Sequence, residues 1–279
     1  MKKTILILSL FISAASMAQK NTGDSKGIVL AKDQKIRIIS TTEQETDLGM
    51  GMQMTNNAKT EHNIVVKEVQ PDSFKISSSV VKMQMHTDMM GKVMDFDSDK
   101  KEDRESELGK SLSAELDKVK TMTIYRKTGK VTAEKIVEVK TDDADPMSMM
   151  TNAAGANDDA LVAGAFFLVP AGKKVGDSWT DSSSVEKMKT VNSYKLLSLD
   201  KDIATVSLTS HIAGTSAMEM MGMQFDVTMD TNSTGQLTVN TKTAAVKTRT
   251  LVGDINSTVD MSGQSQVVTG KTKTTISYE

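Results

Sequence analysis

Apolar and polar residues alternate one by one along most of the chain. The alternation is clearest in residues 48–54, 74–76, 204–208, 221–229 and 246–252. Successive side chains of a strand point to opposite faces, so this pattern predicts strands with one buried and one wet face. Thr, Val and Ile are frequent in these runs and favour strands. The chain is therefore predicted to be mainly β, with antiparallel sheets.

Two segments depart from this alternation. Residues 100–120 carry apolar side chains at helical spacing among charged ones, at Leu108, Leu112, Leu116 and Val119. This spacing predicts one amphipathic helix. Residues 158–169 are largely apolar and stop at Pro170, which predicts a short buried helix or crossing segment. Residues 141–157 are rich in Asp, Asn, Ser and Gly and are predicted to be a linker.

An internal repeat relates the two sides of this linker. Three pairs of segments resemble one another in the same order: 69–76 and 199–206, 88–96 and 219–227, and 128–132 and 234–238. The spacing within the pairs changes only after the predicted helix, as expected if a helix is inserted in the first copy alone. Thr128-Gly129 and Thr234-Gly235 are predicted to be hairpin turns.

The expected organisation is two related antiparallel β-meander halves, residues 27–140 and 170–279. The first β-rich half occupies residues 19–140 and contains the helix at about 100–120. Residues 158–279 hold the short apolar helix and the second half. Such halves are expected to form curved sheets of half-barrel or clam-like shape, and the sequence leaves open whether there is one long sheet or two facing ones.

Residues 1–18 have the features of a signal peptide. Lys2 and Lys3 precede an apolar run, and small residues occupy Ser16 and Ala18 before Gln19. The expected location is the periplasm, with secretion or peripheral association with the outer membrane as alternatives. No later run has the length of a transmembrane helix, so no transmembrane segment is expected. The sequence has no cysteine, which excludes a lipidated cysteine anchor, a disulfide and a thiolate site.

Charge and motifs argue against several functional classes. The 34 basic and 36 acidic residues nearly balance, and no basic stripe is interleaved with aromatic residues, so no nucleic-acid partner is expected. His62, His86 and His211 accompany no G-x-S-x-G, phosphate-loop or H-E-x-x-H motif. No catalytic residue is assigned, no cofactor is expected, and the protein is predicted not to be an enzyme. The acidic runs at 95–99 and 142–145 lack calcium-loop spacing and are interpreted as solvated turns.

One motif stands between the halves. Pro170 is followed after five residues by Gly176-Asp177-Ser178-Trp179. This arrangement, behind a signal peptide and between β-rich halves, resembles an uncharacterised family of exported bacterial proteins that carry a domain-of-unknown-function label. The resemblance implies export and a β-rich fold, and no reaction. From the residues themselves, Gly176 and Asp177 are expected to form a turn, and Trp179 to begin a strand with its indole in the core.

Methionine is the most unusual component, with 21 of 279 residues, whereas aromatic residues make up only 4%. The simplest interpretation is that methionine fills the core. Methionine also lines adaptable surfaces for apolar ligands. The candidate ligand-binding residues are Met83, Met85, Met89, Met90, Met218, Met220, Met221 and Met223.

The leading hypothesis is an exported, non-enzymatic binding protein of the cell envelope. Its partner is expected to be an apolar ligand, a lipid or acyl chain, or an apolar surface of an envelope protein. An alternative is Cu(I) binding, because thioether and imidazole ligands suit this ion, through Met83, Met85, His86, Met89 and Met90. A third alternative is a structural or adhesive envelope protein.

Overall fold

The computed structural model describes residues 27–49, 51–113, 116, 118–133, 158–185, 187–220, 223–261 and 264–279. The strands are β1 (Lys35–Asp47), β2 (Gln53–Val69), β3 (Ser73–Met89), β4 (Lys92–Asp97), β5 (Lys120–Tyr125), β6 (Val131–Ala133), β7 (Ser178–Val185), β8 (Met188–Asp200), β9 (Ile203–Met220), β10 (Met223–Asn240), β11 (Val246–Met261) and β12 (Gln264–Tyr278). The helices are α1 (Lys101–Glu105), α2 (Glu107–Ser113) and α4 (Asp158–Gly164).

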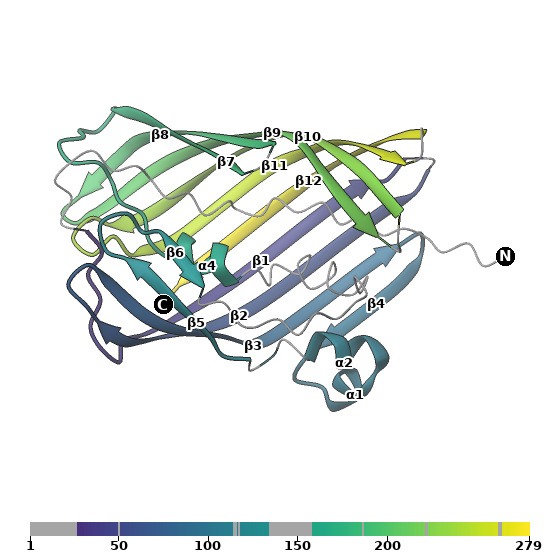
Figure 1. The fold of residues 1–279 in the computed structure, drawn as a ribbon, viewed down its shortest axis with the longest axis horizontal. Coiled ribbons are helices and arrows are strands. Elements are labelled where there is room, and N and C mark those ends of the chain that lie inside the picture. Colours follow the sequence, from purple (N-terminus) through teal and green to yellow (C-terminus); the bar gives the residue numbers. More distant parts are fainter. Residues whose placement is uncertain are drawn as a thin grey trace.

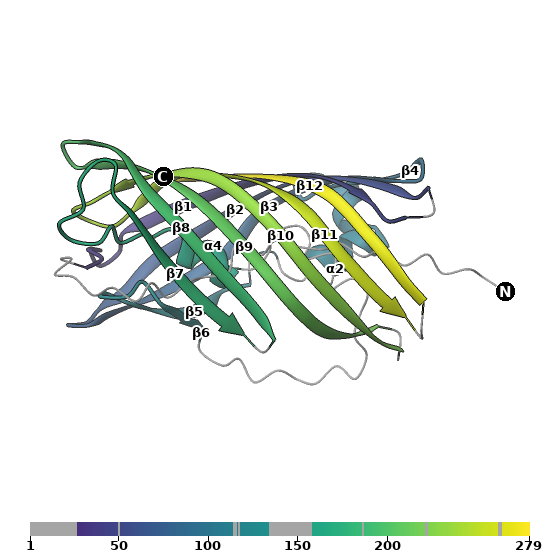
Figure 2. The ribbon, with the colours of Figure 1, turned by 90° about the horizontal axis from the view of Figure 1, so that it is seen from above.

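All twelve strands belong to one antiparallel sheet, in the order β6-β5-β3-β2-β1-β12-β11-β10-β9-β8-β7, with β4 also on β3. The first and last strands, β1 and β12, pair from Ile38 opposite Tyr278 to Asp47 opposite Thr269. This pairing joins the two halves, so they form one sheet. Within the described residues the sheet is open, because its end strands β6 and β7 do not pair. Figures 1 and 2 show that it bends into a curve with α4 on the inner side.

The inserted helix interrupts a strand position that is continuous in the second half. Strand β10 pairs with β9 along the whole of β9. In the first half, β4 and β5 share the corresponding edge of β3: β4 pairs with its C-terminal part and β5 with its N-terminal part. Thr128-Gly129 forms the predicted turn between β5 and β6.

The second predicted turn, Thr234-Gly235, is wrong. Both residues lie inside β10, opposite β11. A Cβ added to Gly235 would stand 1.9 Å from the carbonyl oxygen of Thr250. Glycine at this position therefore permits close strand approach and does not supply a turn conformation.

The predicted single helix at 100–120 is also wrong. The segment forms two short helices, α1 and α2, separated by Ser106 in an extended conformation. The Ser106 hydroxyl accepts a hydrogen bond from the Gly109 N–H at 2.9 Å and donates one to the Asp103 carbonyl at 2.7 Å. A serine that accepts from the third residue after it is a helix N-cap, so Ser106 begins α2 as a separate helix. Leu112 is buried as predicted, whereas Val119 is 64% exposed.

Replacing Ser106 with alanine should lower the free energy of unfolding by about 1 kcal/mol, the usual cost of a lost N-cap. Urea unfolding followed by circular dichroism measures the change. Ser193→Ala, at an exposed strand position, is the control and should leave the midpoint almost unchanged. Equal midpoints for Ser106→Ala and wild type would show that the hydroxyl does not hold α2 in place.

The main core fills one end of the inner side of the sheet. Strand residues such as Ile38, Ile64 and Val206 pack there against the segment that follows α4. The predicted apolar segment is buried, but its helix stops at Gly164. Residues 165–167 then run beside β11, with hydrogen bonds from Val246 to Ala165 and from Phe167 to Ala244. Backbone pairing thus replaces the helix before the proline is reached.

The Pro170–Trp179 motif has the local structure expected from the sequence. Gly176 has a φ of 96°, and the Asp177 carboxylate accepts the Lys174 N–H at 2.9 Å. Trp179 lies near the start of β7 and packs against the main core. Its ring stacks on Tyr194 at 5.5 Å between centroids. The motif therefore closes a turn and anchors the first strand of the second half.

Candidate ligand-binding face

The inner face of the sheet carries a second apolar group at the end opposite the main core. We call it the methionine cluster. It consists of Leu48, Met52, Met54, Met89, Val227, Met229, Ile255, Val259 and Val268. Met52 and Met229 are partly exposed, and the others are buried. The cluster draws on both halves of the chain, because β2 and β3 contribute from one side of the β1–β12 junction and β10 and β11 from the other.

The topology explains why methionines collect at this end. Four hairpins turn here, as the strand-end pairs Asp47 with Gln53, Met89 with Lys92, Met220 with Met223 and Met261 with Gln264 show. Alternate hairpins of an antiparallel sheet turn at the same end. Methionines distant in sequence therefore lie along one rim of the sheet, at or next to these strand ends: Met52, Met54, Met89, Met90, Met220, Met223 and Met261.

The structure distributes the predicted ligand-binding residues over separate places. Met83 and Met85 are buried with Phe96 and Leu112, in a third apolar group beside α2. Met89 belongs to the methionine cluster. Met90 is 58% exposed at the β3–β4 turn with a φ of 57°.

The second predicted group is only partly described. Met218 and Met220 end β9, and Met223 begins β10. Their side chains, and Met221 entirely, fall outside what the structure describes. Met52, Met54 and Met229 were not among the ligand-binding residues predicted from the sequence. Their place in the cluster follows from strand register, in which Met54 faces Met89, and no local signal in the sequence reveals it.

The five residues of the copper hypothesis do not meet at one point. Met83 and Met85 are buried on the inner face, whereas His86 points outward. The His86 Nδ1 lies 2.6 Å from the Asp95 carboxylate. Within the described residues, no group of three or more His, Cys, Asp or Glu side chains is placed to hold a metal ion.

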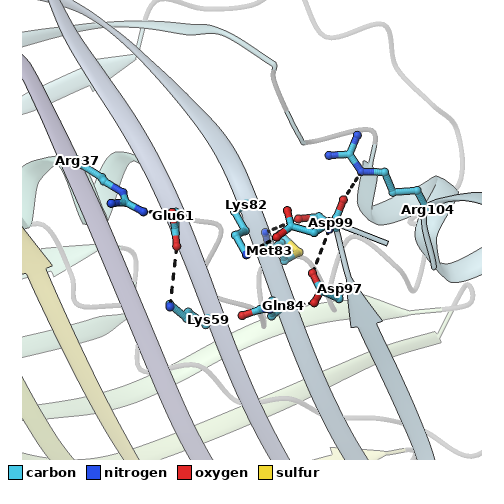
Figure 3. Close-up of polar contacts among 10 residues, drawn as sticks. Arg37, Lys59, Glu61, Lys82, Met83, Gln84, Asp97, Asp99 and Arg104 are labelled. Atoms are coloured by element: carbon cyan, nitrogen blue, oxygen red, sulfur yellow. Dashed lines mark hydrogen bonds and ion pairs between the residues drawn. The ribbon is translucent and has the colours of Figure 1, made fainter. Parts of the chain in front are cut away.

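A shallow groove of about 600 Å³ crosses the outer face of β1 to β4. Its charged lining residues are Glu43, Lys59, His86, Asp95, Asp97, Lys100 and Asp103. The pKa of Asp97 is lowered, first by the Asp99 N–H and then by the Gln84 amide that it accepts. Figure 3 shows the adjoining ion pairs, Lys82 with Asp99 and Glu61 with both Arg37 and Lys59. These pairings mark a solvated charged surface.

Polar residues occupy the inner face between its apolar regions. The buried ones are Ser40, Gln44, Thr46, Asn56, Thr60, His62, Ser78, Thr87, Thr190, Asn192, Thr231, Ser233 and Ser257. Some pair with each other, as when the Thr87 hydroxyl donates to the Asn56 amide oxygen at 3.0 Å. The buried hydroxyls of Ser78, Thr231 and Ser257 have no hydrogen-bond partner. The inner face is therefore apolar at its ends and polar between them.

Comparison with solved structures shows a similarity of fold to lipovitellin. A lipovitellin structure described as "Lipid-protein interactions in lipovitellin" is 6% identical and aligns with a TM-score of 0.51 over 90% of this chain. The alignment covers 25% of the lipovitellin chain, so this chain spans about a quarter of it. An outer membrane channel from Pseudomonas putida F1 is 8% identical over 94% of this chain and 100% of its own. Its TM-score of 0.21 is too low to indicate a shared fold.

Searches with the sequence add one match. No curated protein matches the chain. Residues 162–246 match the family of unknown function DUF6263. This segment runs from α4 to the start of β11 and includes the Pro170–Trp179 motif.

No helix in the described residues is long and apolar enough to cross a membrane.

Proposed function

We propose that this protein is an exported, non-enzymatic binding protein of the cell envelope, and that it binds a lipid or acyl chain on the inner face of its sheet. The observation that carries the proposal is the methionine cluster, an apolar group at the end of an open sheet away from the main core, in which Met52 and Met229 keep part of their surface exposed. Export rests on the signal-peptide pattern of residues 1–18.

The chemistry of the cluster suits a ligand of variable shape. Methionine side chains are unbranched, flexible and polarizable, so they re-pack around different apolar groups. Met52 and Met229 keep part of their surface exposed at the cluster, which provides contact area for a ligand. The fold similarity to lipovitellin, whose structure concerns lipid–protein interactions, supports the same ligand class.

Exposed apolar side chains at the same rim favour an envelope protein as a second candidate partner. Met90 is 58% exposed, Val93 50% and Val267 61%. They lie outside the methionine cluster, so the two surfaces are separable by substitution.

Two adjacent valines of β12 provide a matched test of the proposal. Val268 is buried in the cluster, whereas Val267 faces outward. Val268→Glu should weaken binding of the fluorescent probe N-phenyl-1-naphthylamine to delipidated protein at least about tenfold, because a carboxylate is costly to bury. Val267→Glu should change the affinity less than about twofold, because its side chain is already in water.

A milder variant guards against a folding defect. Val268→Thr replaces one methyl group with a hydroxyl and keeps the side-chain shape, so the protein should fold and bind the probe a few-fold more weakly. Circular dichroism checks the fold of each variant. Failure of the wild type to bind the probe, or equal affinity in all three variants, would count against an apolar site at this cluster.

A further inference from the structure

Arg249 is a cation on the inner face of the sheet. It lies on β11 between Leu237 of β10 and Ile276 of β12, and both neighbours belong to the main core. Its Nε is buried and has no hydrogen-bond partner. No ion pair to Arg249 is formed within the described part of the chain. Arg249 as a whole residue is only partly buried.

The Tyr278 hydroxyl adjoins this guanidinium. Tyr278 follows Ile276 on the same face of β12 and is only 9% exposed. Its hydroxyl has no hydrogen-bond partner among the residues that the structure describes. Both groups end beside Gly164 of α4, where an added Cβ would stand 2.9 Å from the Tyr278 hydroxyl and 3.2 Å from Arg249 Nη1. Burial raises the pKa of Tyr278 to about 12, with a smaller opposing effect from Arg249, so the hydroxyl carries its proton at neutral pH.

The buried Arg249 Nε–H and the Tyr278 hydroxyl would each be stabilised by a hydrogen-bond acceptor. A cation or hydroxyl removed from water without a partner costs free energy. A guanidinium presents parallel N–H groups that match a carboxylate, and the resulting charge-assisted bonds are strong. A neutral phenol beside it adds one more donor. One cation and one hydroxyl fit an anion with a single negative charge.

Along β11, the inward positions between Arg249 and the methionine cluster carry no polar side chain, whereas the polar residues Thr231 and Ser233 lie on the neighbouring strand β10. The inward residues of β11 run from Arg249 through Leu251 to Ile255, which belongs to the methionine cluster. Six residues of an extended strand span about 20 Å. A ligand with a carboxylate at Arg249 thus has its tail directed toward the methionine cluster.

We propose that Arg249 and Tyr278 bind the carboxylate of a fatty acid whose tail lies on the inner face of the sheet. This inference rests on the proposed function and narrows its ligand class from lipids in general to free fatty acids.

The test compares palmitate with hexadecanol, which has the same chain length and no charge. Each competes with the fluorescent probe on delipidated full-length protein. We expect Arg249→Met to weaken palmitate at least about tenfold, because bonds to charged groups are lost, and to leave hexadecanol within about twofold. Arg249→Lys keeps the charge without the planar fork and should be intermediate.

Arg37→Met is the control. Arg37 lies on the outer face, 2.5 Å from Glu61, and its loss should leave palmitate affinity unchanged. If Arg249→Met and Arg249→Lys both bind palmitate as wild type does, the carboxylate site is wrong while the proposed function stands. An equal loss of palmitate affinity in Arg37→Met would also overturn the site. If neither palmitate nor hexadecanol binds the wild type, the proposed function itself fails.

Discussion

Phe167→Ala should lower the free energy of unfolding by about 3–5 kcal/mol, the range for truncating a buried phenylalanine. Phe167 is 8% exposed in the segment that follows α4 and belongs to the main core. Its ring lies 5.1 Å from that of Tyr194 and 6.4 Å from that of Trp179, between centroids. The substitution removes these contacts and leaves a cavity where the sheet closes over the segment.

Chemical denaturation at neutral pH measures this effect. Tyr125→Ala is the aromatic control, because Tyr125 is 43% exposed on β5, and it should cost less than about 1 kcal/mol. Similar losses for the two variants would mean that residues 165–168 do not anchor this end of the sheet.

Tyr278→Phe should protect the protein at alkaline pH. Burial raises the pKa of Tyr278 from 10.0 to about 12. Between these values the unfolded chain releases the phenol proton and the folded chain keeps it, so wild-type stability falls as pH rises. At about 1.4 kcal/mol per pKa unit, the wild type should lose about 2–3 kcal/mol relative to Tyr278→Phe between pH 10 and 12. Below pH 10 this difference vanishes.

Urea midpoints of both proteins across pH 8 to 12 provide the comparison. The wild type and Tyr278→Phe should have similar midpoints at pH 8, because the variant loses a hydroxyl that has no partner. Tyr125→Phe, at an exposed position, should follow the wild type throughout. If the urea midpoints of wild type and Tyr278→Phe change with pH in parallel, the Tyr278 hydroxyl is exposed to water and its pKa is not raised by burial.

The sequence pattern identified the strands and most of their inward positions, because side-chain period is a local property. Ile76 and Val206 are buried as the alternation predicts. The alternation of apolar and polar residues predicted a strand wrongly where a turn has the same pattern. The alternation continues through residues 48–52, but β1 ends at Asp47 and β2 begins at Gln53, and Gly49 and Gly51 between them have φ values of 80° and 75°.

The prediction of which β11 side chains face inward was also wrong. The run 246–252 placed its Val and Thr residues on one face, yet Val252 is 48% exposed. The strand pairing shifts between Thr238 and Val239 opposite the start of β11, and this irregularity changes which residues face inward. Arg249 and Leu251 thereby occupy the inner face. No local signal in the sequence announces such a shift.

The pairing that joins the two halves could not be predicted from local sequence patterns, for a different reason. Strands β1 and β12 stand at opposite ends of the described chain, and pairing between distant segments depends on the whole fold. The methionine cluster forms across that junction. Its membership could not be predicted from the runs of methionine, because it depends on which distant strands pair.

The most direct test of the central claim is native mass spectrometry of the protein purified without detergent from its own cell envelope. We expect a lipid-sized mass above that of the protein, present in wild type and in Val267→Glu and lost in Val268→Glu. A wild-type protein that carries no bound lipid, even after incubation with an excess of cell lipids, would contradict it.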